Sequence, residues 1–143
     1  MINIDSIIKS LEDIFKKLPP LPANAVATLF KITPWLAIIF GILGLIGALA
    51  AFGIFTVFAP FAIVGRYSNY GLGLISTIGL AVSSLMMIVA FPSLKAGKMA
   101  GWNLLFWSEI ISIGSSLLSI SVGTILGAVI GLYILFQIKP KYK

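Results

Sequence analysis

Few side chains in this sequence could take part in chemistry. Cysteine and histidine are both absent, which excludes disulfides, thiolate metal sites, histidine-ligated zinc or haem and Ser-His-Asp triads. The acids that remain are Asp5, Glu12, Asp13 and Glu109, beside ten basic residues and four tyrosines. From this inventory we predict no catalytic, cofactor or metal site, and we expect a protein that is not an enzyme.

Glu109 has the most unusual surroundings of the four acids, because it lies inside a long apolar stretch. Ser112 and Ser116 follow it at spacings of three and seven, so a helix would place all three on one face, with Trp107 close by. An ionised carboxylate inside a bilayer is unfavourable unless it is paired, hydrated or protonated. One interpretation is therefore a proton or cation site formed by Glu109, Ser112, Ser116 and Trp107.

The alternative interpretation of Glu109 is structural. It lies seven residues after Trp102, which is about 10 Å along a helix from the expected cytoplasmic interface. Its side chain could therefore reach that interface, or pair with Lys95 or Lys98 in the preceding loop. This shallow depth slightly favours the structural interpretation.

Glycine recurs at every fourth position near the end of the chain, at Gly123, Gly127 and Gly131. Such a glycine-zipper row clears a groove along one helix face and permits close helix packing in membranes. The groove could accept serines of the preceding helix in the same chain, or it could form a contact between copies. A short connection between the two helices favours the first arrangement.

The composition indicates a membrane protein. Hydrophobic residues make up 59% of the chain and charged residues 10%, whereas soluble domains carry about 25% charged residues. The mean hydropathy is +1.12. A chain so poor in charge cannot cover a surface that faces water, so we expect the lipid bilayer to be its solvent and partner.

Four apolar segments are long enough to cross a bilayer, at about residues 34–58, 71–91, 102–118 and 122–138. The last two belong to one apolar run, which as a single helix would be about 55 Å long against a hydrocarbon core of about 30 Å. That run must therefore fold back, with its turn at residues 119–123, where serine and glycine can satisfy backbone groups. We predict an all-α membrane protein with a four-helix transmembrane bundle, residues 34–138.

Residues 1–33 form a separate N-terminal segment. Apolar residues recur there at helical spacing up to Leu18, and charged residues fill the opposite face. We expect this amphipathic helix to lie on the cytoplasmic face of the membrane, and packing on the protein itself or on another copy is the alternative. A short interfacial helix should end near Lys31, and Thr33 as cap with Pro34 at the first helical position should begin the first span.

Basic residues mark one side of the predicted membrane domain. Nine of the ten lie in the N-terminal segment, in the loop after the second span or in the basic tail, residues 139–143, and Arg66 is the exception. The positive-inside rule then predicts a multi-pass protein of the cell (inner or plasma) membrane with both termini cytoplasmic. Since the basic residues are scattered between apolar runs, the net charge of +6 indicates topology, and we expect no nucleic-acid partner.

These features favour a small non-enzymatic membrane protein that acts by packing, as an assembly or scaffold unit in a homo-oligomer. The alternative function is a small transporter or ion channel that uses Glu109 to bind a proton or a cation. The surroundings of Glu109 discriminate between the two. A wet cavity would favour the transporter, and contact with headgroups or loop lysines would favour the structural role.

Overall fold

The computed structural model describes residues 3–65, 70–119 and 122–143, and all regular structure in these residues is helical. The elements in chain order are α1 (Ile4–Phe15), α2 (Ala23–Gly65), α3 (Tyr70–Lys95), α4 (Met99–Ser119), α5 (Val122–Ile138) and the short 3₁₀ helix η1 (Lys139–Lys141). The all-helical fold predicted from the sequence is thus confirmed, with one short N-terminal helix ahead of four longer ones.

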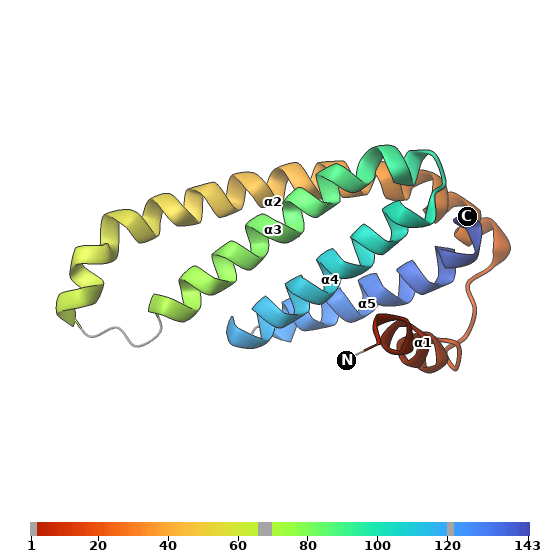
Figure 1. Ribbon diagram of the computed structural model, residues 1–143, viewed down its shortest axis with the longest axis horizontal. Helices are drawn as coiled ribbons and strands as arrows, with labels where there is room; N and C mark the ends of the chain where they lie inside the picture. The colour runs from red at the N-terminus through yellow and green to blue at the C-terminus, as the bar shows by residue number, and fades with distance from the viewer. Residues whose placement is uncertain (1–2, 66–69, 120–121) are drawn as a thin grey trace.

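The four long helices pack in chain order, and each runs antiparallel to the one before it (Figure 1). α3 lies between α2 and α4, and α4 lies between α3 and α5. α5 also touches α2, so the layer of helices curves back on itself. α1 packs against the C-terminal half of α5 (Figure 1).

Among the described residues, two helices are long and apolar enough to cross a membrane, over Ala23–Ala62 in α2 and Tyr70–Lys95 in α3. In their most hydrophobic windows, only 11% of the first and 22% of the second is buried inside the structure. Most of this apolar surface therefore faces outward.

The prolines correct two helix boundaries predicted from the sequence. We expected one helix to begin at Pro34 and another to end at Pro92, but both residues lie inside longer helices, α2 and α3. The Thr33 hydroxyl donates to the Leu29 carbonyl (2.6 Å), so it bonds back along α2 and does not cap a new helix. α2 changes direction in its last turns, drawn yellow-green in Figure 1, where Pro60 removes a backbone hydrogen bond.

The apolar run from Trp102 onward folds back as predicted, because α4 and α5 are separate helices that pack antiparallel. The turn itself was placed at residues 119–123, and its centre, residues 120–121, lies outside the described residues.

Small residues bring α2, α3 and α4 close together. A side chain at Gly44 of α2 would collide with Ser84 of α3, and one at Gly79 of α3 would collide with Ser115 of α4. Close approach through such residues is usual between membrane helices. One α4 serine, Ser115, therefore lies against α3, whereas the sequence favoured contact of the α4 serines with the glycine groove of α5.

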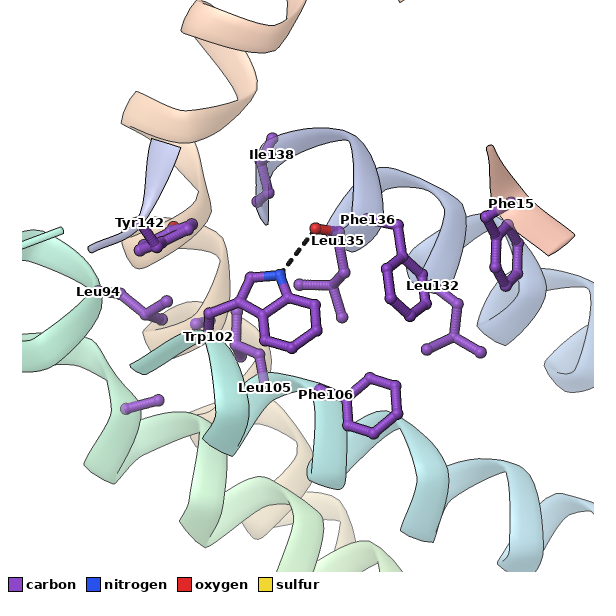
Figure 2. Packing of buried hydrophobic residues seen from close by; sticks show 12 residues of the cluster. Phe15, Leu94, Trp102, Leu105, Phe106, Leu132, Leu135, Phe136, Ile138 and Tyr142 are labelled. Atoms are coloured by element: carbon purple, nitrogen blue, oxygen red, sulfur yellow. Dashed lines mark hydrogen bonds between the residues drawn. The ribbon is translucent and has the colours of Figure 1, made fainter. Parts of the chain in front are cut away.

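The most densely buried part of the molecule is the end of the bundle where α3 passes into α4 and where α5 ends (Figure 2). Trp102 is fully buried there, and its indole N–H donates to the Leu135 carbonyl (2.7 Å). This bond joins the first turn of α4 to the last turn of α5. We call this region the closed end, defined by Leu94, Trp102, Phe106, Ile138 and Tyr142.

The C-terminal tail completes the closed end by pairing with the turn between α3 and α4. Gly97 has a φ of 67°, which suits glycine, and its carbonyl accepts the Lys143 N–H (2.9 Å). The Met99 N–H donates in turn to the Lys143 carbonyl (2.8 Å). Tyr142 is buried with its ring 4.9 Å from that of Phe30, and burial raises the pKa of Tyr142 to about 12.

α1 docks on the end of α5. The Phe15 ring stacks on Phe136 with 5.3 Å between centroids. The Glu12 carboxylate forms ion pairs with Lys139 of η1 and with Lys16, the C-cap residue of α1. Hydrogen bonds from these two lysines, above all from Lys139, hold the pKa of the Glu12 carboxyl below its usual value.

The sequence left two arrangements of the amphipathic helix open, contact with the membrane surface and packing on the protein itself or on another copy. Docking of α1 on α5 is packing on the protein itself. Apolar side chains still remain uncovered on α1 and just after it, namely Ile4, Ile14 and Leu18. Contact of this uncovered edge with a membrane surface therefore stays a prediction.

Candidate functional site

The four long helices line a partly open cavity of about 620 Å³. Its walls are mostly apolar, and they include Leu36 and Phe40 of α2 and Ile134 and Leu135 of α5. Polar side chains enter mainly from α3 and α4, and the charged residue among those that line the cavity is Glu109.

Glu109 is half-buried on α4 with its carboxylate against α5. A side chain at Gly131 would overlap the Glu109 Oε1 atom, so the glycine leaves the space that the carboxylate occupies. Within the described residues the carboxylate has no ion pair or hydrogen bond, and in particular none with Lys95 or Lys98. The sequence allowed either a cavity or contact with headgroups and loop lysines around Glu109. In the structure Glu109 lines a cavity.

Two further predicted residues, Ser112 and Ser116, line the cavity with Glu109, as their spacing on α4 requires. The Ser116 hydroxyl is buried and donates to the Ser112 carbonyl (2.7 Å). Trp107 does not line the cavity, and its ring lies edge-on to Phe106 at 5.4 Å. The face shared by the three polar residues was therefore predictable, and the position of the neighbouring tryptophan was not.

Three buried serines line the cavity beside Glu109, Ser112 and Ser116. Ser108 of α4 and the pair Ser83 and Ser84 of α3 line the cavity. Their hydroxyls donate to carbonyls of their own helices, Ser108 to Leu105 (2.8 Å) and both others to Leu80 (3.1 and 2.6 Å). The sequence signal for the α3 residues was two adjacent serines in a mostly apolar helix, a pattern that packing explains equally well.

The glycine row of α5 forms one wall of the cavity. Gly123 and Gly127 have open space where a side chain would stand, whereas Gly131 faces Glu109. No neighbouring helix of the described chain closes on the first two. A packing role for them therefore stays a prediction, and it would concern a second copy of the chain.

The polar groups that line the cavity are one carboxylate, that of Glu109, and several serine and threonine hydroxyls. These groups decide which ligands the cavity can bind. No group of three or more acids in the described part of the chain could hold a metal ion. A carboxylate with no cation beside it, in a cavity with mostly apolar walls, is stabilised by binding either a proton or a positively charged group. Both would occupy the same oxygens, so they would compete.

Comparisons with known proteins add no relative: no family model, no curated protein and no solved structure matches this chain.

Proposed function

We propose that α2–α5 form a four-helix bundle that spans the cell membrane with both termini in the cytoplasm. The outward-facing apolar surface of α2 and α3 supports lipid contact. α4 has 21 residues and α5 has 17, or about 32 and 26 Å of helix, close to the hydrocarbon thickness of about 30 Å. The bias of nine basic residues against Arg66 sets the orientation.

The topology can be tested because the chain has no natural cysteine. Single cysteines in place of Gly71, at the start of α3, and Ala96, just after it, occupy exposed positions. They should label from opposite sides of intact cells, with Gly71→Cys accessible from outside. Labelling of both from the same side would contradict the four-span arrangement.

Within this bundle we propose that Glu109 binds a cation in exchange for a proton, and that the protein is a small transporter. One observation carries the proposal: the Glu109 carboxylate has no partner in the described chain and faces a cavity. A structural acid would be expected to have an ionic or hydrogen-bond partner, and Glu109 has none within the described residues.

The mechanism follows from competition for two oxygens. When a cation binds, the carboxylate releases its proton; when the cation leaves, a proton neutralises the acid again. The cavity then carries less uncompensated charge in either bound state than it does empty, which favours exchange over release alone. Such exchange couples cation movement to proton movement.

The experiment uses purified protein in liposomes that contain a pH-sensitive dye. Inward gradients of monovalent cations, from K⁺ and Na⁺ to alkylammonium ions, should drive proton efflux with at least one of them in the wild type. Glu109→Gln keeps the shape and removes the titrating charge, so the efflux should vanish. Asp13→Asn is the control, since it removes an exposed acid outside the cavity. Efflux that persists in Glu109→Gln, or its absence with every cation, would refute the transporter.

Assembly into a homo-oligomer is the second candidate, and it rests on the open space at Gly123 and Gly127. A neighbouring copy could bring a helix against this row, because small residues allow close backbone approach in lipid. Gly127→Leu should then lower the oligomer order measured by light scattering in detergent, whereas Gly114→Leu, at another exposed glycine with open space, should not. An unchanged order in Gly127→Leu would remove the support for assembly through α5.

A further inference from the structure

The cavity around Glu109 is larger than an inorganic ion requires. Its volume of about 620 Å³ lies in the range of pockets for small organic molecules, about 300–1,000 Å³. Most of the wall is apolar, so a bare ion would leave that wall without contacts. An occupant with a charged group and an apolar body would use both parts of the cavity.

The polar groups of the cavity are hydrogen-bond acceptors in nearly every case. Five buried hydroxyls that line the cavity already donate hydrogen bonds to backbone carbonyls of their own helices. They belong to Thr33, Ser83, Ser84, Ser108 and Ser116. A hydroxyl that donates can still accept through its oxygen, and the Glu109 carboxylate accepts when it is ionised. Among the described residues that line the cavity, Ser112 alone keeps an uncommitted hydroxyl. The complement of this surface is a ligand with several N–H donors.

The cavity is also open to the outside along its apolar walls. Leu36 and Phe40 line it and yet are 40% and 58% exposed. Gly127 on the opposite wall is exposed too, with open space beside it. In a membrane this opening faces lipid, so a ligand that partitions into the bilayer reaches the cavity sideways.

We propose that the cavity binds a protonated primary amine that carries an apolar alkyl or aryl body. The ammonium N–H groups donate to the Glu109 carboxylate and to serine oxygens, and the body lies between Phe40 and Leu135. This inference rests on the proposed role of Glu109 and adds the chemical class of its cation. A quaternary ammonium ion carries the same charge but no N–H donor, so the acceptors of α3 and α4 distinguish the two ions.

The test measures binding of dansylcadaverine, a primary amine with a fluorescent aromatic body, to the purified full-length protein in detergent. Wild type should give saturable enhancement above the micelle background. Glu109→Gln should weaken binding about tenfold or more, since a hydrogen bond to a charged group is lost. Glu109→Asp keeps a carboxylate and should bind better than Glu109→Gln, and Asp13→Asn should equal the wild type.

Competition then identifies the class of ligand. Hexylamine should displace the probe at least about tenfold more effectively than hexyltrimethylammonium, and 1-hexanol, NaCl and KCl should not displace it. Equal displacement by the quaternary ion would overturn the amine proposal and leave a cation site at Glu109. Displacement by NaCl or KCl alone would replace the amine with an inorganic ion. Probe binding that does not respond to Glu109→Gln would refute both the amine and the role of Glu109.

Discussion

The two halves of the helical bundle are built in opposite ways. At the closed end, Trp102 and Phe106 have no exposed surface, and α1, the tail and the α3–α4 turn are all fastened to the helices. In the far half, which comprises residues 45–65, 70–80, 112–119 and 122–127, large apolar side chains face outward, with Val57 and Phe61 both 67% exposed. At the closed end, ring contacts of Trp102 and Phe106 with Phe136 join α4 to α5. In the far half, the small residues Gly79 and Ser115 allow α3 and α4 to approach closely.

This difference teaches where the molecule can be rigid and where it can adapt. The cavity extends from Leu135 and Ile138 at the closed end to Ser116 and Gly123 in the far half, with Glu109 between them. We therefore expect the closed end to hold the four helices in register, and the far half to adjust the width of the cavity around a ligand.

Truncation of Trp102 should produce the largest effect. Trp102→Ala removes the buried ring and its hydrogen bond to Leu135, and it should lower the free energy of unfolding in detergent by about 3–5 kcal/mol. Phe58→Ala, in the far half and 57% exposed, should change it by less than about 1 kcal/mol. Equal losses would show that the two halves are equally well packed.

Gly131 and Gly123 sharpen the comparison inside the cavity. Alanine at Gly131 would overlap the Glu109 Oε1 atom and displace the carboxylate, whereas alanine at Gly123 meets open space. Overpacking costs about 1–3 kcal/mol, and here the extra methyl group would move the carboxylate that binds the amine. Gly131→Ala should therefore weaken dansylcadaverine binding about tenfold. Gly123→Ala should leave it unchanged. If both variants bound like the wild type, the position of Glu109 against α5 would be unimportant.

Acid should loosen the closed end before it affects the far half. The lysines beside Glu12 lower its pKa, so this ion pair stabilises α1 docking at neutral pH and is lost as the pH falls through that lowered pKa, below 4.5. Glu12→Gln should remove about 1 kcal/mol of docking at neutral pH. Faster amide hydrogen exchange in α1, corrected for the intrinsic pH dependence, is the measurement. Unchanged exchange in Glu12→Gln would show that Phe15 alone holds the helix.

The smallest effect concerns the hydroxyl of Tyr142. This buried group has no hydrogen-bond partner in the described chain, and its raised pKa keeps it protonated at neutral pH. Tyr142→Phe retains the ring contact with Phe30 and removes an unsatisfied polar atom, so stability should stay equal or rise by up to about 1 kcal/mol. A loss larger than this would reveal a partner such as a buried water molecule.

Periodicity and length predicted the helical fold, the reversal after Trp102 and the common face of Glu109, Ser112 and Ser116. These features depend on residues close together in the chain, where helix geometry fixes the relation. The continuation of α2 through Pro34 was missed because the pair Thr33-Pro34 fits two structures. Thr33 could cap a new helix, or its hydroxyl could donate to the carbonyl four residues earlier, as it does to Leu29.

The remaining features depend on contacts between distant segments. The stacking of Phe15 on Phe136 and the meeting of Glu109 with Gly131 require the relative rotation of two helices, which a single sequence does not specify. For the same reason Ser83 and Ser84 gave no sign that they would face the same cavity as Glu109.

The ion pair between Glu12 and Lys139 also bears on the order of events during synthesis. Its residues are 127 positions apart, whereas the most extensive helix contacts, α2 with α3 and α3 with α4, join helices that are neighbours in the chain. α1 therefore emerges from the ribosome long before its docking surface exists, and its apolar face needs a temporary shelter that the lipid surface can supply.

A cysteine at Phe15 should accordingly be protected from a water-soluble thiol reagent in the full chain. The same cysteine should also react slowly in a membrane-inserted chain that is truncated before α5, because lipid then covers the apolar face of α1. Reaction as fast as in a free peptide in water would exclude such a shelter.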